Sequence, residues 1–163
     1  MLVSRRRSLT TVRCASGGFT LVDMVVTVLI IGILAAAVAP RFANTIHAYR
    51  ADAAAQRLQA DLGWARQHAI SSSAVVIVQF SPGSSAYTIS GVMHLDQGGQ
   101  PYDVDLLDDP YQASVTAPTF GGDNAVQFDR FGQPDSGGTI TVTSGGSSQT
   151  VTIDADTGRA SIP

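Results

Sequence analysis

Apolar residues fill almost every position from residue 19 to residue 39, where the polar side chains are Thr20, Asp23 and Thr27. A helix of this length spans about 31 Å at ~1.5 Å per residue, which matches a hydrocarbon core of about 30 Å. The run is longer than the apolar part of a cleaved secretory signal, which is about 7–15 residues. The pattern therefore predicts a single transmembrane helix over residues 19–39.

After Pro40 the pattern becomes amphipathic, because apolar residues recur at spacings of four and three with polar residues between them. This spacing predicts that the helix continues, with Pro40 kinking rather than ending it, and that it closes near three serines at 71–73. The predicted helix therefore spans residues 19–73. The residues expected to form its buried stripe are Phe42, Ile46, Tyr49, Ala53, Leu58, Leu62, Ala65 and Ala69, and the polar residues between them include Asp52, Arg57, Asp61 and Arg66.

From residue 74 onward, short runs rich in Val, Ile, Thr and aromatic residues alternate with Gly, Pro, Asp and Ser, as strands and turns do. Residues 144–148 predict a hairpin turn. The fold class expected is α+β, with a long N-terminal helix packed on a C-terminal antiparallel β-sheet domain. The predicted strands cover residues 75–80, 87–89, 92–95, 114–116, 125–128, 139–143 and 149–153.

Charge divides the chain of 163 residues, which has neither Lys nor Glu, into two parts. Residues 1–18 carry four Arg and no acid, whereas residues 19–163 carry six Arg and thirteen Asp, a formal net charge of −7. Positive charge before an apolar run places the N-terminus in the cytoplasm and the residues after Pro40 outside. We therefore expect a leader over 1–18, a helix over 19–73 and an exported β domain over 74–163.

The residues around this boundary, Gly18-Phe19-Thr20-Leu21-Val22-Asp23 before an apolar run and Pro40, resemble the type IV prepilin motif. The resemblance implies cleavage between Gly18 and Phe19 by a prepilin peptidase, N-methylation of Phe19, and assembly from the inner membrane into a filament. It also implies that Asp23 pairs with the N-terminal amine of a neighbouring subunit. The family usually has Glu at this position, so Asp23 reaches one methylene less far.

Three further stretches resemble GspH/FimT-type minor pilins: residues 62–70 of the helix, residues 128–134 and residues 156–159. The resemblance implies a minor pseudopilin, a structural subunit of the periplasmic pseudopilus of type II secretion. The partners implied are other pseudopilins or minor pilins, the prepilin peptidase and the inner membrane. The alternative is a FimT-like minor type IV pilin that acts in pilus assembly or DNA uptake.

Other functions find less support in the sequence. DNA binding needs a cationic patch, but the chain after residue 18 is acidic and its C-terminal tail holds Arg159 alone, so we expect no nucleic-acid partner. No GxSxG or other catalytic spacing occurs, so we expect no enzyme and no cofactor. The acidic side chains that calcium could use lack EF-hand spacing and predict a solvated loop; they are Asp96, Asp103, Asp105, Asp108 and Asp109.

Histidine gives no metal site either. His68 follows Trp64 by four residues on one helix face, which favours packing of that face against the β domain. His47 and His94 are isolated in the sequence. We therefore expect no metal.

Overall fold

The computed structural model describes residues 18–81, 83–93 and 99–163. The chain divides into two compact units, Met1–Ala39 and Pro40–Pro163. One helix, α1 (Leu21–Ser72), contributes residues to both units and remains helical through Pro40. The prediction that the helix continues past Pro40 and ends near residues 71–73 is therefore confirmed, whereas its start lies two residues later than expected.

The sequence predicted a membrane span over residues 19–39. Among the residues that the structure describes, no helix is long and apolar enough to cross a membrane.

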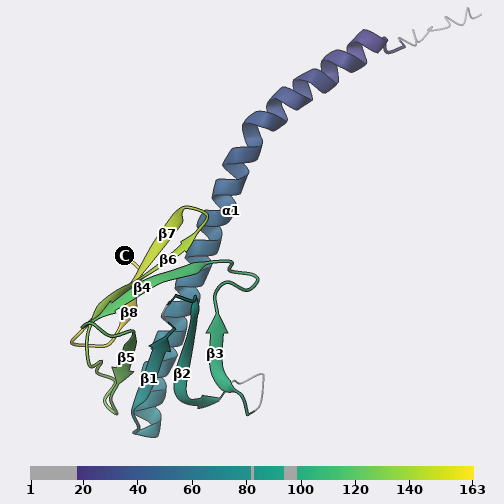
Figure 1. Cartoon of the computed structure of the whole chain (residues 1–163). Coiled ribbons are helices and arrows are strands. Elements are labelled where there is room, and N and C mark those ends of the chain that lie inside the picture. Colours follow the sequence, from purple (N-terminus) through teal and green to yellow (C-terminus); the bar gives the residue numbers. More distant parts are fainter. Residues whose placement is uncertain (1–17, 82, 94–98) are drawn as a thin grey trace, which may run out of the picture. The chain divides into compact units, whose positions relative to one another are not determined.

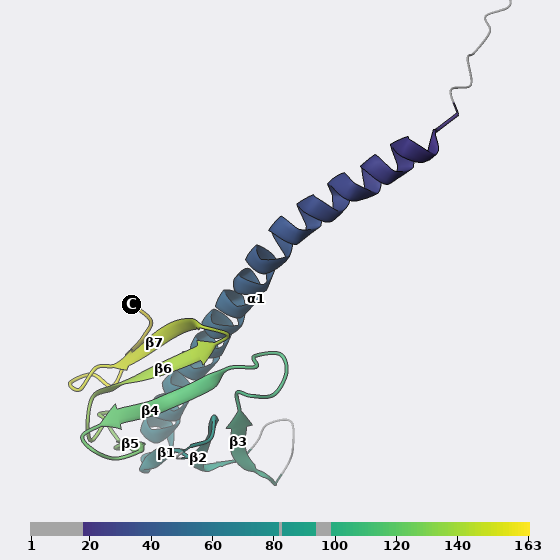
Figure 2. The same ribbon diagram turned by 45° about the horizontal axis from the view of Figure 1, so that its top comes forward.

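The second unit holds the described strands, which form two antiparallel four-stranded sheets, in the orders β3-β2-β1-β5 and β4-β6-β7-β8. Figures 1 and 2 show both sheets against the part of α1 that belongs to this unit. The predicted α+β class, a helix packed on antiparallel sheet, is confirmed. The strands are β1 (Val76–Phe80), β2 (Ala86–Met93), β3 (Pro101–Asp105), β4 (Ser114–Phe120), β5 (Ala125–Phe128), β6 (Gly138–Ser144), β7 (Ser147–Ile153) and β8 (Ala160–Ser161).

Two features of the sheets differ from the sequence expectation. The runs expected at 87–89 and 92–95 are, as far as they are described, parts of one strand, β2, with an irregularity in register between Ile89 and Met93. Residues 101–105, expected in an acidic loop, form β3 instead. Their side chains alternate between exposed and covered, with Tyr102 and Val104 facing inward, and this is the period-2 pattern of a strand with one buried face.

The hairpin turn expected at 144–148 is confirmed between β6 and β7, where Ser144 pairs with Ser147. Gly145 and Gly146 form this turn with φ of +51° and +91°. Two successive residues with positive φ match the twist of a hairpin, and glycine adopts them without a steric penalty.

A single core joins the helix to both sheets. Leu58, Leu62, Ala65 and Ala69 are buried on the helix, as the spacing predicted. They pack with inward side chains from both sheets, among them Val78, Phe80, Tyr87, Val126, Phe128, Ile140, Val142 and Val151.

The first part of the predicted stripe is wrong. Phe42, Ile46 and Tyr49 are exposed by 67%, 38% and 78%. Helix residues buried in the core begin at Ala51, and from there toward the C-terminus they include Ala54 and Ala55. Periodicity shows that a helix has an apolar face, but it does not show how far along that face the sheets extend.

Candidate functional site

The N-terminal end of α1 is built as a capped helix. The backbone N–H of Asp23 donates to the Thr20 hydroxyl at 3.2 Å, and the N–H of Met24 donates to the Thr20 carbonyl at 3.2 Å. Thr20 therefore acts as the N-cap. Asp23 lies in the first turn with an exposed side chain, where a carboxylate also complements the helix dipole.

The predicted processing residues lie directly before this cap. Gly18 and Phe19 are exposed and precede the first helical residue, and the Phe19 side chain is 91% exposed. Cleavage at Gly18–Phe19, methylation of Phe19, an assembly role for Asp23 and a kink at Pro40 stay predictions.

The helix that follows the cap exposes apolar side chains in every direction. Each large apolar side chain from Phe19 to Leu34 is exposed, from 45% at Val26 to 91% at Phe19. A helix that is apolar on all sides is normally covered, and an exposed apolar surface of this extent marks an interaction site.

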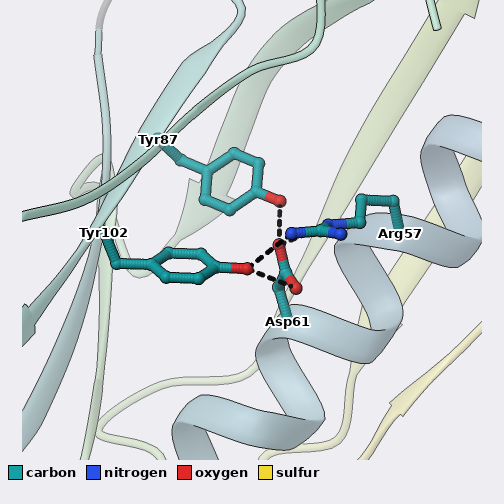
Figure 3. A network of polar contacts seen from close by, with 4 residues as sticks. All are labelled: Arg57, Asp61, Tyr87 and Tyr102. Atoms are coloured by element: carbon teal, nitrogen blue, oxygen red, sulfur yellow. Dashed lines mark hydrogen bonds and ion pairs between the residues drawn. The ribbon is translucent and has the colours of Figure 1, made fainter. Parts of the chain in front are cut away.

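The second unit buries a polar network between α1 and β2 and β3, shown in Figure 3. Asp61 accepts hydrogen bonds from the hydroxyls of Tyr87 at 2.5 Å and Tyr102 at 2.9 Å. Arg57, one turn earlier, forms an ion pair with Asp61 at 3.0 Å and donates to the Tyr102 hydroxyl at 2.7 Å. Asp61 is 7% exposed, so a charged side chain lies in the core with its oxygens satisfied.

Burial and the neighbouring charges shift the pKa values of the side chains in this network. Burial, and after it the negative charge of Asp61, raises the pKa of Tyr102 to about 12. The same two causes raise the pKa of Tyr87 well above its ordinary value. Burial alone would lower the pKa of Arg57, but Asp61 and the two phenols reverse that and raise it. Both tyrosines therefore stay neutral donors to the Asp61 carboxylate at ordinary pH.

The sequence did not place Asp61 in the core, since it was read as one of the polar residues outside the apolar stripe. That interpretation is wrong, because Asp61 belongs to the buried face of the helix between Leu58 and Leu62. Two tyrosines at inward positions of β2 and β3 are the signal that could have indicated a buried acceptor.

A second junction joins α1 to two loops of the β domain. The Nε–H of Arg66 is shared between the carbonyls of Gly132 at 3.0 Å and Thr157 at 2.9 Å. Gly132 has φ of +78°, and a Cβ there would lie 2.7 Å from Ile70; a Cβ on Gly158 would lie 2.5 Å from the Gly132 carbonyl. The three stretches singled out in the sequence (62–70, 128–134 and 156–159) therefore meet at Arg66.

The remaining candidates do not gather into a site. His68 packs beside Trp64 with ring centroids 5.7 Å apart, as expected, and His47 lies against Gly145 of the β6–β7 turn. Asp103, Asp105, Asp108 and Asp109 are exposed, and Asp96 and His94 lie outside the described residues. Within the described part of the chain, no group of three or more His, Cys, Asp or Glu side chains could hold a metal ion.

One helix shared by an exposed apolar end and a packed antiparallel β domain defines the class of pilin-like subunits. The fold is similar to crystal structures of the type IV minor pilin FimU of Pseudomonas aeruginosa PAO1 in two space groups, at 18% sequence identity. The TM-scores are 0.53 and 0.52, and the matches cover 69% of this chain and 87% and 91% of FimU.

The sequence profile of the family described as type II transport protein GspH matches residues 54–157, which is more than half of the chain. The chain therefore belongs to the GspH family. The match contains Arg66 and Gly132 and ends at Thr157, so it spans the Arg66 junction. No curated protein matches the sequence at a significant level.

Proposed function

We propose that this chain is a minor pseudopilin, a structural subunit of the type II secretion pseudopilus and not an enzyme. The observation that carries the proposal is the apolar surface of residues 19–34, which the described chain leaves uncovered. Helices of neighbouring pseudopilins would cover this surface in the filament.

Before assembly, the apolar segment would lie in the inner membrane as a single pass, with the N-terminus in the cytoplasm and the β domain in the periplasm. The four Arg of residues 1–18 support this orientation. Prepilin peptidase would cleave between Gly18 and Phe19, and the new Phe19 amine would be methylated. Mass spectrometry of the N-terminus tests this step: we expect a chain that begins at N-methylated Phe19, and a chain that retains residues 1–18 contradicts it.

Asp23 would then pair with the cationic amine of an adjacent subunit. Neither charge is favourable alone in an apolar setting, so the pair would fix the register between subunits. We expect Asp23→Ala to leave cleavage intact and to lower co-purification with the other pseudopilins roughly tenfold, about 1.4 kcal/mol. Asp23→Glu is the matched control, and it should retain incorporation. Unchanged incorporation of Asp23→Ala contradicts the proposed pairing.

The second unit adds its own surface for neighbours. Phe42, Ile46 and Tyr49 are exposed at helical spacing on α1, so they lie along one face. We propose that another subunit covers this face as well. Replacing Phe42 and Tyr49 by serine should lower incorporation without lowering the stability of the β domain.

The alternative is a FimT-like minor pilin of a type IV pilus, acting in pilus assembly or DNA uptake, and the likeness in fold to a minor pilin favours keeping it. A deletion strain separates the two functions. Loss of protein secretion with normal pili supports the pseudopilus, whereas loss of pili with normal secretion supports the alternative.

A further inference from the structure

The free edges of the two sheets are the places where the β domain could pair with a strand of another molecule. The orders of the described strands leave such edges on β3, β5, β4 and β8. An unpaired edge presents a row of backbone N–H and C=O groups that another chain can pair with, so proteins normally cover or guard it. Hydrogen bonds among the described residues show how each of these edges is treated.

The edges on β5 and β8 are covered by the chain itself. At the outer side of β5, the Gln127 N–H donates to the Asp135 carboxylate at 3.0 Å, and the Gln127 carbonyl accepts the Asp135 N–H at 2.9 Å. β8 is 2 residues long, and its Ala160 carbonyl accepts a hydrogen bond from the Gln59 amide of α1 at 3.1 Å. Neither edge therefore offers a continuous row of backbone groups to another strand.

The edge on β4 is covered in the same way. The N–H of Ala113, just before the strand, donates to the Leu106 carbonyl at 2.8 Å, and the N–H of Val115 donates to the Ser85 hydroxyl at 3.2 Å. Further along, the register of β4 against β6 is irregular, and Pro118 has no N–H to offer. The chain itself thus blocks this edge as well.

The edge on β3 differs from the other three. Figure 1 shows β3 at the outer side of its sheet, beside β2. The N–H of Leu106, just after β3, donates to the Ser85 carbonyl, just before β2, at 3.2 Å. Alternate residues of an antiparallel strand bond to the same neighbour, so Asp103 and Asp105 direct their backbone groups away from β2. No described residue forms a backbone hydrogen bond with these outward groups.

The side chains of these same two residues are charged. Asp103 and Asp105 are exposed, and they lie on one face of β3 because side chains alternate along a strand. If β3 of a second copy paired antiparallel with this edge, carboxylates would lie opposite carboxylates, and like charges at opposite positions destabilise a strand pair. The edge without hydrogen-bonded cover is therefore an edge that carries charge.

We propose that Asp103 and Asp105 guard the β3 edge against pairing with a strand of another molecule, above all with β3 of a second copy. Neighbouring molecules would then contact the β domain through side chains and not by adding a strand to a sheet. The proposal concerns the β domain alone and does not depend on the pseudopilus function. Its failure is therefore distinct from a failure of leader cleavage or incorporation.

The test measures self-association of the full chain in detergent by analytical ultracentrifugation. Hydrogen exchange at the amides of residues 103 and 105 shows whether β3 forms the contact. Asp103→Thr with Asp105→Thr removes both charges and introduces residues that favour strands, and a threonine hydroxyl at 105 can still accept the Leu107 N–H that Asp105 accepts at 2.8 Å. We expect this variant to associate roughly tenfold more tightly than wild type, because two cross-strand repulsions are removed, and to protect both amides from exchange.

A charge-reversed variant separates repulsion from other effects. Asp103→Lys with Asp105→Lys again places like charges opposite each other, so alone it should associate no more tightly than wild type. Mixed with wild type, its lysines would face aspartates, so the mixture should associate more tightly than either chain alone and protect both amides. Asp123→Thr with Asp156→Thr removes the same two charges from exposed positions outside β3. This matched control should behave like wild type.

The proposal is overturned if the threonine variant associates no more tightly than wild type, or if the control or the lysine variant alone associates as tightly as the threonine variant. A mixture that gains nothing overturns it too. Association that leaves the amides of residues 103 and 105 unprotected also overturns it, because the contact then lies elsewhere. Equal melting temperatures show that a gain in association is not due to unfolding. If the threonine variant melts lower than wild type, Asp103→Asn with Asp105→Asn replaces it, because asparagine removes the charge and keeps the shape of the side chain.

Discussion

Between Phe19 and Leu34 every large apolar side chain is exposed, whereas between Ala51 and Ala69 the helix is rich in alanine and buries its stripe, including an aspartate. The N-terminal segment has more hydrophobic surface and no described cover. The C-terminal segment has less hydrophobic surface, but the strands that cover it supply Tyr87 and Tyr102, which donate hydrogen bonds to Asp61. The difference shows that hydrophobicity alone does not tell whether a helix face belongs to its own fold or to an assembly.

The loss of Asp61 would break this comparison most directly. Asp61→Ala removes the carboxylate to which Tyr87 and Tyr102 donate and with which Arg57 pairs, so the free energy of unfolding should fall by about 3 kcal/mol. Denaturant unfolding of the full chain, followed by fluorescence of the one tryptophan, Trp64, reports this directly.

The matched control for that variant lies on the same helix. Asp52 is hydrogen-bonded to Gln56 one turn away at 2.8 Å, in an exposed setting. Asp52→Ala should cost less than about 0.5 kcal/mol. If the two variants are equally stable, the buried network contributes nothing that an exposed pair does not.

The Arg66 junction gives the next effect. Gly132→Ala places a Cβ 2.7 Å from Ile70 at φ of +78°, so backbone strain and overpacking together should cost about 2–4 kcal/mol. Gly91 has φ of +75° with nothing near its would-be Cβ. Gly91→Ala should therefore cost about 1–2 kcal/mol, from the backbone alone. Equal costs for the two variants in denaturant unfolding would contradict a packed junction.

A smaller effect depends on pH. The folded pKa of Tyr102 is raised to about 12, and tyrosine in an unfolded chain has a pKa near ~10. The stabilisation from the neutral Tyr102 hydroxyl is therefore fully present below about pH 10 and lost as the pH rises toward about 12. The chain has no lysine, so no lysine titration overlaps this window.

Tyr102→Phe should lower stability at neutral pH by about 1 kcal/mol and should reduce the alkaline loss, of which Tyr87, whose pKa is also raised, keeps its own share. Tyr111→Phe is the matched control, because Tyr111 packs on the core without a described side-chain hydrogen bond. Unfolding curves measured between neutral pH and pH ~11 check both, given the unfolded tyrosine pKa near ~10. An alkaline loss of the same size in Tyr102→Phe would show that Tyr102 is not its source.

The sequence predicted the elements that have strong local patterns. The stripe from Leu58 to Ala69, the strands with alternating Thr and apolar residues, and the Gly145-Gly146 turn all follow from spacing within a few residues. Local patterns do not reveal partners distant in the chain. Asp61 could not be placed inside without its tyrosines 26 and 41 residues away, and β3 was missed because its exposed positions are aspartates.

Because local patterns do not reveal distant partners, the sequence predicted neither the Arg66 junction nor the point at which the buried stripe begins. Arg66 donates to carbonyls 66 and 91 residues away. Every residue has a backbone carbonyl, so the sequence does not indicate which carbonyls accept these hydrogen bonds. Phe42 and Tyr49 have the spacing of a core face, yet the sheets do not reach them. The prediction of a processing site at Gly18 and Phe19, by contrast, rests on a motif of adjacent residues, which can be read directly from the sequence.

The smallest effect on stability tests the N-terminal side of the comparison. Leu29 is 60% exposed, so Leu29→Ala should change the unfolding of the β domain by less than about 0.5 kcal/mol. Leu62 is 1% exposed in the core, and Leu62→Ala should cost about 2–5 kcal/mol. If another molecule covers residues 19–34, Leu29→Ala should nevertheless lower co-purification with the other pseudopilins. Denaturant unfolding and co-purification of the same two variants measure both quantities. Full incorporation of Leu29→Ala, together with a variant at Val28 that behaves likewise, would show that this surface is not where the subunits meet.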